Sequence, residues 1–311
     1  MRLLALHGSG SNRDVTKMQL ENLGVSEPEY DVVYANGPVS VDKSGPGIAE
    51  IEGLISGPWY SWLPQVMGEG ELERDIMLNG ICVAVQRVLE IIADEGPFDG
   101  VFGFSQGGVI ASLVNDLFQD KALLTALKDR MDETTLLALP DAAPFRAAVI
   151  ACAAAPISLS QLREKVGLGP SPIPNSKFQS VHLIGRKDNF KSWSESFALD
   201  LNSTNISVLY LDNGHEINQL QRGNAEVISQ VRDCFSGAQT SFEELPAAPK
   251  ALEWRKSSDL SSRSIASDAQ IAAVKVKMEG IPDTIIGMLA AQPANAPLFR
   301  LAREQNADVL T

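Results

Sequence analysis

The chain has 311 residues, 44% of them hydrophobic and 21% charged, which suits one α/β domain with an appendage. Its formal net charge of −13 argues against nucleic acid or an anionic membrane surface as the main partner, because both require clustered lysine and arginine. We find no apolar run of about 18 residues and so expect no membrane span. The three scattered cysteines form neither a disulfide framework nor a metal-binding pattern, so we expect a cytoplasmic protein without metal or cofactor.

Short apolar runs alternate with longer amphipathic stretches along the first 235 residues. The runs predicted as strands are Leu3–Leu6, Tyr30–Tyr34, Gly100–Gly103, Ala147–Ala151, Ser180–Ile184 and Ser207–Leu211. Several are apolar at consecutive positions, as expected for strands buried on both faces of a parallel sheet. The stretches predicted as helices are Asn79–Glu95, Ser105–Leu117, Trp193–Leu199 and Asn224–Phe235. This alternation predicts an α/β fold, with a mostly parallel sheet and helices on both faces.

Three regions interrupt this alternation. Residues 37–70 are rich in glycine and proline and read as a long ordered loop, a kind of loop that is usually functional. Residues 121–144 read as polar and helical, and together with the proline-rich stretch 167–175 they could flank a pocket. From about residue 236 alanine, serine and proline dominate, which predicts a linker over 236–267 and a short, partly helical C-terminal extension over 268–311.

The most informative motif is Gly-Phe-Ser-Gln-Gly at residues 103–107, a GxSxG pattern between a predicted strand and a predicted helix. Glycines two residues before and after Ser105 allow a tight turn that raises the serine hydroxyl above the sheet edge. The motif alone is weak, because an ordinary glycine-rich turn produces it too. Its place between strand and helix favours Ser105 as a nucleophile.

A serine nucleophile needs a general base, and the chain has three histidines. His7 lies in an N-terminal motif, and His182 lies mid-strand, where a satisfied sheet histidine is the simpler interpretation. His215 follows the strand Ser207–Leu211, and open α/β sheets present catalytic groups just beyond strand ends. We therefore predict His215 as the base; the alternative is a surface histidine beside a turn glycine.

The third member of a triad orients the imidazole and stabilises its charged form. Asp188 lies just past the strand Ser180–Ile184, and the chain order Ser105, Asp188, His215 is that of α/β-hydrolases. Asp212 is a rival, but it precedes an Asn-Gly turn that it would serve. We predict Asp188.

An oxyanion hole needs two main-chain N–H groups aimed at the tetrahedral oxygen. We predict the N–H of Gln106, directly after the nucleophile, and the N–H of Ser9 in the turn His7–Gly10. That turn could instead be merely flexible or bind phosphate, but no GxxxxGK or GxGxxG pattern follows it. Three aromatic residues in the long loop, Trp59, Tyr60 and Trp62, are predicted either to line an acyl pocket or to anchor the loop to the core.

With these residues in place, the chain resembles the family serine hydrolase (FSH) group of α/β-hydrolases over roughly residues 1–235. The blocks that carry the resemblance are Leu4–Gly8, Gly57–Trp62, Phe98–Gly108, His182–Asp188 and Gly214–Glu216. The resemblance implies the α/β-hydrolase fold and a small carboxylesterase or thioesterase with little lid, with Ser105, Asp188 and His215 as its triad. It implies acyl esters as substrates, and some fungal relatives release polyketides from carrier-bound thioesters. The stretch 119–146 is longer and more polar than a minimal member needs.

Two other functions are compatible with these residues. The same triad could serve a serine peptidase or an acyltransferase. Alternatively, the chain could be a catalytically silent binding module. The C-terminal extension lies outside the resemblance, and it could dock a partner protein, form a dimer or regulate the domain.

Overall fold

The computed structural model describes residues 1–48, 54–65, 71–128, 144–154, 159–169, 179–200, 206–217 and 222–237. The strands are β1 (Arg2–Leu6), β2 (Asp31–Ala35), β3 (Val39–Val41), β4 (Trp59–Ser61), β5 (Gly100–Phe104), β6 (Ala147–Ala151), β7 (Gln179–Gly185) and β8 (Ile206–Leu211). The helices are α1 (Arg13–Asn22), α2 (Glu71–Glu95), α3 (Gln106–Leu117), α4 (Lys121–Lys128), α6 (Leu159–Lys165), α7 (Lys191–Asp200) and α8 (Ala225–Ser236).

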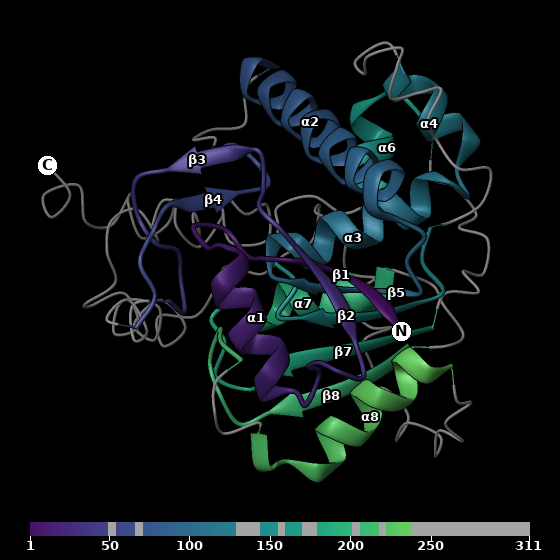
Figure 1. The fold of residues 1–311 in the computed structure, drawn as a ribbon. Helices are drawn as coiled ribbons and strands as arrows, with labels where there is room; N and C mark the ends of the chain where they lie inside the picture. The colour runs from purple at the N-terminus through teal and green to yellow at the C-terminus, as the bar shows by residue number, and fades with distance from the viewer. Residues whose placement is uncertain are drawn as a thin grey trace, which may run out of the picture. The chain divides into compact units, whose positions relative to one another are not determined.

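Six of these strands form one sheet in the order β2-β1-β5-β6-β7-β8, and every neighbouring pair is parallel (Figure 1). All six are strands that the sequence predicts. Every residue of β5 and of β6 is buried, as their unbroken apolar sequence indicated. Because the strands are parallel, the loops that follow β1, β5, β7 and β8 all open at the same edge of the sheet.

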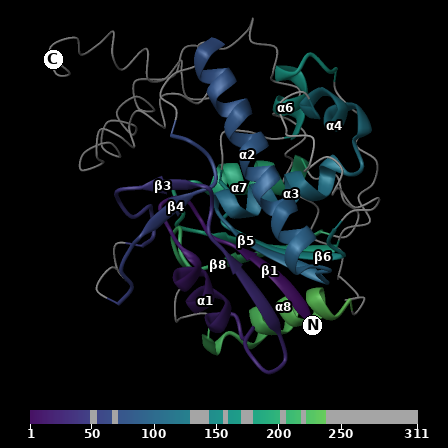
Figure 2. The same ribbon diagram turned by 45° about the horizontal axis from the view of Figure 1, so that its top comes forward.

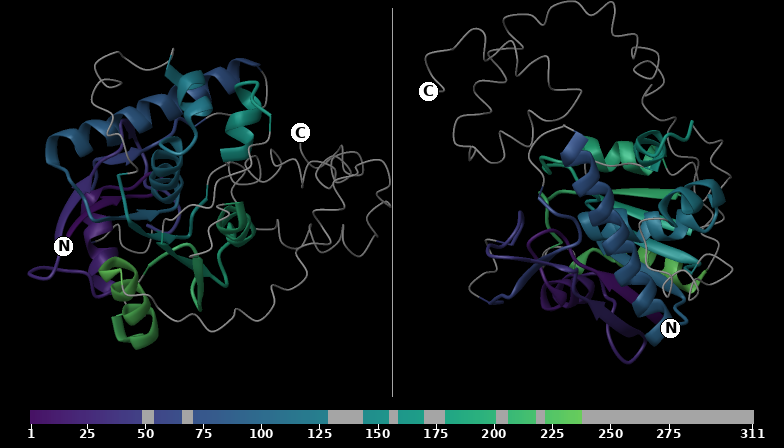
Figure 3. Two further views of the ribbon diagram at one scale, coloured as in Figure 1. Left: turned by 90° about the vertical axis from the view of Figure 1, so that its right-hand side faces the viewer. Right: turned by 90° about the horizontal axis from the view of Figure 1, so that it is seen from above.

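Helices cover both faces of this sheet, as predicted. Helices α1 and α8 lie on one face, where Leu20 and Val231 join a core with Phe102, Val149 and Leu183 (Figure 2). Helices α2 and α3 lie on the other face, and the turned views show the same arrangement (Figure 3). The core therefore consists of two apolar layers with the sheet between them.

The structure adds elements that the sequence analysis missed. Helix α1 is capped at its N-terminus by Asn12, whose side chain accepts hydrogen bonds from the N–H groups of Asp14 and Val15. Its buried face includes Thr16 and Gln19, so its apolar periodicity is weak. Strands β3 and β4 form a small antiparallel hairpin within the long loop, and α2 begins eight residues before the predicted start.

One compact unit comprises residues 1–65 and 74–241 and holds both sheets. A second unit takes in residues 66–73 and 242–311, and of these only 71–73, the first turn of α2, are described. The first two residues of the predicted linker, Ser236 and Gly237, are the last residue of α8 and its C-cap. The rest of the linker, the predicted extension, the stretch 129–143 and most of 167–175 lie outside the described residues.

By length and composition alone, Asp75–Glu95 of α2 could cross a membrane, contrary to the expectation that no such segment exists. Half of the most apolar 18 residues of this segment are buried inside the protein. A helix that packs on a sheet has the same length and apolar composition, so this finding is weak evidence for a membrane span.

Candidate active site

Ser105 occupies a strained turn between β5 and α3. Its φ is 52° and its ψ is −120°, in the left-handed half of conformational space that residues other than glycine rarely adopt. The N–H of Ser105 donates to the carbonyl of Ala151 on β6 at 2.8 Å. The hydroxyl of Ser105 therefore projects from the edge of the sheet, at the point where β5 ends and α3 begins, as the motif predicted.

The two flanking glycines are required by close packing around this turn. A Cβ on Gly103 would lie 2.5 Å from the Cα of Gly108 in α3, and one on Gly107 would lie 2.4 Å from the carbonyl oxygen of Leu6 in β1. Both distances are shorter than any carbon contact tolerates, so helix α3 can approach β1 and β5 only with glycine at these positions. The spacing of the motif is thus explained by contacts within the fold.

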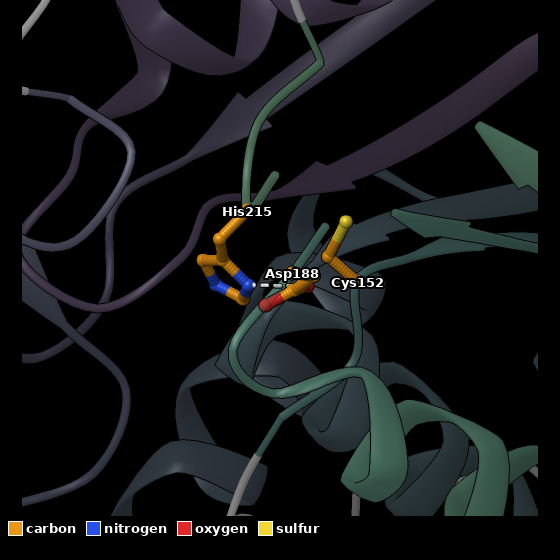
Figure 4. Close-up of side chains that lie close together, drawn as sticks. All are labelled: Cys152, Asp188 and His215. Atoms are coloured by element: carbon orange, nitrogen blue, oxygen red, sulfur yellow. Dashed lines mark hydrogen bonds and ion pairs between the residues drawn. The ribbon is translucent and has the colours of Figure 1, made fainter. Parts of the chain in front are cut away.

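Ser105, His215 and Asp188 form a continuous hydrogen-bonded line. The Oγ of Ser105 lies 3.0 Å from Nε2 of His215, and Nδ1 of His215 lies 2.8 Å from Oδ2 of Asp188. Figure 4 shows the imidazole facing the carboxylate. The side chain of Asp188 is fully buried, and that of His215 is 9% exposed. The three predicted residues therefore lie in the order that proton transfer from the serine requires.

The loops that carry Asp188 and His215 hold each other in place. The second carboxylate oxygen of Asp188, Oδ1, accepts the N–H of Phe190 at 2.7 Å. The imidazole lies between two rings, with centroid distances of 5.1 Å to Phe104 and 5.0 Å to Phe190. A Cβ on Gly185 would lie 2.2 Å from the carbonyl oxygen of Gly214, so the two loops touch through their main chains. These contacts restrict the histidine to one orientation.

The other acid and histidines considered in the sequence lie elsewhere. Asp212 is exposed and pairs with Arg186 at 3.1 Å, so it does not compete with Asp188. His182 is buried in β7 with its ring 6.3 Å from that of Phe197, and burial lowers its pKa to about 4. It is an uncharged sheet histidine, as predicted, but its buried Nε2 has no hydrogen-bond partner among the described residues, so the expectation that its ring is fully satisfied is wrong.

Cys152 lies beside Asp188 (Figure 4). Apart from Ser105, it is the one non-glycine residue in the described part of the chain with a left-handed backbone, at φ 48°. Its sulfur, an oxygen of Asp188 and a nitrogen of His215 lie within 4.8 Å of one another, the kind of group that can hold a metal. Burial, reinforced by the Asp188 carboxylate, raises the pKa of the thiol well above its usual range. A metal would need the thiolate and would displace the bond between Asp188 and His215, so these residues fit the hydrogen-bonded arrangement better.

The predicted oxyanion loop lies directly against the nucleophile. A Cβ on Gly8 would lie 3.2 Å from the Cβ of Ser105, so the turn after β1 passes beside the serine. His7 is buried there, and its Nε2 accepts the N–H of Gly37 at 2.8 Å. Burial lowers the pKa of His7 to about 4, so the ring is neutral and its Nδ1 donates to the carbonyl of Gly8 at 2.6 Å. This hydrogen bond fixes the start of the turn that carries Ser9.

The three predicted pocket aromatics differ in their environment. Trp62 is fully buried, and its Nε1 donates to the carbonyl of His7 at 2.9 Å. The centroid of its ring lies 5.5 Å from that of the His7 imidazole. These contacts are those of an anchor, the second of the two interpretations of this residue. Trp59 and Tyr60 lie in β4 and are half-buried, so a role in binding an acyl group stays a prediction for them.

The long glycine-rich loop reaches both parts of the site. A Cβ on Gly45 would lie 1.9 Å from the carbonyl oxygen of Ser9, and one on Gly47 would lie 2.1 Å from that of His215. The N–H of Gly45 also donates to the carbonyl of Gly10 at 2.8 Å. These contacts agree with the prediction of an ordered loop for its described residues, and a functional role of the loop stays a prediction.

Sequence reasoning missed Phe190, Gly45 and Cys152, and it also missed Ser61, whose Oγ accepts the N–H of Gly10 at 3.0 Å. No motif marks Phe190 or Cys152, because their importance comes from packing against residues distant in the chain. Ser61 stood inside a block that resembles the family, Gly57–Trp62, and that block was the one available signal for it.

A parallel α/β sheet with a serine in a strained strand-to-helix turn, bonded in line to a histidine and a buried aspartate, defines a serine hydrolase of the α/β-hydrolase type. Residues 1–226 match the serine hydrolase (FSH1) family, and the chain belongs to that family.

Curated relatives of this chain are fungal and animal hydrolases. It is 40% identical over 114 residues to hydrolase phiM of Talaromyces stipitatus, a match that covers 35% of this chain and 42% of that protein, so it spans less than half of that relative. It is 29% identical over 231 residues to esterase FPY3 of Fusarium mangiferae, covering 70% of this chain and 88% of FPY3. It is 26% identical to esterase OVCA2 of Xenopus tropicalis, covering 70% and 86%.

Among solved structures, acyl-protein thioesterase 2 of Zea mays aligns with 75% of this chain and 93% of its own length. The identity is 17% and the TM-score 0.48.

Proposed function

We propose that this serine hydrolase cleaves carboxylic esters or thioesters of acyl substrates through an acyl-enzyme formed on Ser105. The observation that carries the proposal is the line from Ser105 Oγ to His215 Nε2 at 3.0 Å and on to Asp188 at 2.8 Å, starting at a strained turn. The names of curated relatives, esterase FPY3 and esterase OVCA2, support ester substrates.

In the first half of the reaction, Ser105 Oγ attacks the acyl carbonyl carbon and its proton passes to Nε2 of His215. Asp188 accepts the hydrogen bond from Nδ1 and stabilises the imidazolium. The negative charge that forms on the carbonyl oxygen accepts hydrogen bonds from the N–H groups of Ser9 and Gln106. His215 then protonates the leaving oxygen or sulfur as its bond to the acyl carbon breaks, which leaves an ester on Ser105.

In the second half, water attacks this ester and gives a proton to His215. The acyl carbon separates from Oγ, which takes the proton back, and a carboxylic acid leaves. Two described features support this assignment of residues. His215 is confined by two aromatic rings to the orientation that faces Ser105, and the turn carrying Ser9 passes beside Ser105.

The substrate class is tested with an acyl-length series of p-nitrophenyl esters and the matching acyl thioesters, each assayed on the parent and on Ser105→Ala. We expect hydrolysis by the parent and a loss of turnover of about 10⁴-fold or more in Ser105→Ala, with an unchanged melting temperature. A fluorophosphonate probe should label the parent at Ser105. Ser229→Ala, which removes an exposed hydroxyl from α8, is the matched control and should keep both properties.

The alternatives have distinct outcomes in the same experiment. A silent binding module would show neither labelling nor hydrolysis in the parent. A peptidase would cleave peptide amides faster than esters, and an acyltransferase would pass the acyl group to an added alcohol in preference to water. Parental activity in Ser105→Ala would contradict the assignment of the nucleophile.

A cytoplasmic location is part of the proposal. All three cysteines are buried free thiols, which suits a reducing compartment. A protein partner for residues 236–311 is likewise proposed, and truncation after Gly237 followed by assays of activity and assembly tests it.

A further inference from the structure

A short segment of the chain, Tyr60–Leu63, touches both loops that would supply the oxyanion donors. It includes the last residue of β4, Ser61, which is fully buried. The Oγ of Ser61 accepts the N–H of Gly10 at 3.0 Å and lies 3.0 Å from the Oγ of Ser9. The hydroxyl of Ser61 therefore contacts both the side chain of Ser9 and the peptide group that joins Ser9 to Gly10.

The same segment also holds the second loop. The side-chain oxygen of Gln106 lies 3.3 Å from the N–H of Trp62 and 3.4 Å from that of Leu63, and it accepts from both. The indole of Trp62 donates to the carbonyl of His7 at 2.9 Å. Three consecutive residues thus connect the turn after β1 to the first residue of α3.

Main-chain hydrogen bonds fix where this segment lies. The N–H of Tyr60 donates to the carbonyl of Ser11 at 2.7 Å, and the N–H of Ser11 donates to the carbonyl of Tyr60 at 3.0 Å. Gly10, between Ser9 and Ser11, has a φ of 60°, which glycine adopts without strain. Because glycine is also the most flexible residue, outside contacts are what restrict the turn to this one conformation. The hydroxyl of Ser61 provides such a contact, because it accepts the N–H of Gly10.

We propose that Ser61 is a positioning residue of the oxyanion hole: its hydroxyl holds the Ser9–Gly10 turn so that the N–H of Ser9 points at the developing oxyanion. Amide donors stabilise an oxyanion only when their direction is set before the reaction, because reorientation during the step costs the energy that they would supply. The inference rests on the proposed function.

A purely structural role for Ser61 has a different signature. In that case the hydroxyl satisfies a buried N–H and supports folding, so its loss lowers the melting temperature but leaves the turnover of each folded molecule unchanged. A positioning role instead lowers kcat and weakens binding of tetrahedral analogues, while binding of the ground-state substrate stays the same.

The test compares the parent with Ser61→Ala and Ser61→Thr. Ser40→Ala serves as the control, because Ser40 is exposed on β3 directly opposite Tyr60. The kcat and KM for a p-nitrophenyl ester are divided by the concentration of active sites, titrated with a fluorophosphonate. The Ki of an alkyl boronic acid, which forms a tetrahedral adduct on the serine, is measured on the same preparations.

For Ser61→Ala we expect kcat to fall about 10- to 100-fold, KM to stay within about twofold, and the boronic acid Ki to rise by the same factor as kcat falls. Ser61→Thr keeps the hydroxyl and should recover most of the loss. Ser9→Ala, which removes the partner hydroxyl but keeps the amide, should show a smaller loss with the same match between kcat and Ki.

Parental kcat and Ki in Ser61→Ala, after active-site titration, would overturn the inference, and so would a fall in kcat without a matching rise in Ki. Parental values in Ser9→Ala would overturn it as well. Failure of the proposed function is recognised separately in the parent. A silent binding module would react with neither the fluorophosphonate nor the boronic acid, whereas a peptidase or an acyltransferase would react with both but would prefer a peptide amide as substrate or an added alcohol as acyl acceptor.

Discussion

On one side of Ser105, the loops after β7 and β8 bring two side chains, Asp188 and His215, into line with the serine hydroxyl. On the other side, the turn after β1 and the start of α3 bring main-chain amides, which Ser61 and its neighbours hold from a third segment. The first side works through side-chain chemistry, so one substitution removes it. In the proposed mechanism the second side works through the direction of backbone N–H groups, so it depends on residues that hold the turn in place, such as Ser61.

The largest effect in this comparison is expected from Asp188→Asn. The amide keeps the size of the side chain but cannot stabilise the imidazolium, and it favours the wrong tautomer of His215. We expect kcat to fall about 10³- to 10⁴-fold, with little change in KM or melting temperature. Steady-state kinetics on an ester of the acyl series measures it. If Asp212→Asn had the larger effect, the aspartate on this side would be wrongly assigned.

A smaller effect is expected from Gly45→Ala, which disturbs the other side through the backbone. The added Cβ would lie 1.9 Å from the carbonyl oxygen of Ser9, so the turn must shift. Displacement of one oxyanion donor should lower kcat about 10- to 100-fold while fluorophosphonate labelling at Ser105 persists. Gly223→Ala is the control, because an added Cβ there meets no atom within 4 Å. Equal kinetics in the two variants would show that this turn tolerates movement.

The smallest effect on turnover is expected from Asp116→Asn, at the far end of α3 from both sides. Burial, with a contribution from Asp120, raises the pKa of Asp116 from 3.8 to about 7. Between these values the folded protein keeps a proton that the unfolded chain releases, so the stability from this group is present below about pH 4 and lost as pH rises to 7.

An asparagine at position 116 does not ionise, so the variant does not lose this stability as the pH rises. We expect the variant to be more stable than the parent by about 1–4 kcal/mol at pH 8, and the difference to vanish near pH 4. Urea unfolding at the two pH values measures it, with kcat unchanged. A constant difference across this range would indicate that Asp116 is ionised in the folded protein, or that the amide acts by packing alone.

The comparison of the two sides also explains which residues sequence reasoning could find. Ser105, Asp188 and His215 have reactive side chains and each follows a predicted strand. The apolar runs in the sequence show where those strands end. Ser61 and Gly45 are common residues in a glycine-rich loop, and nothing local distinguishes them from their neighbours. The choice between the two roles of Trp62 needed the hydrogen bond to His7, a residue 55 positions away.

By itself, the sequence determined the parallel α/β architecture, the strained turn at Ser105 and the order of the three triad residues, because these depend on periodicity and on short motifs with local geometry. Only the tertiary structure decided that Trp62 anchors the long loop through a hydrogen bond to His7, and that the hydroxyl of Ser61 lies within hydrogen-bond distance of Ser9 and Gly10. Those outcomes depend on contacts between segments tens of residues apart. Such contacts follow from how the strands are ordered in the sheet and how closely their loops approach, and no local pattern encodes them.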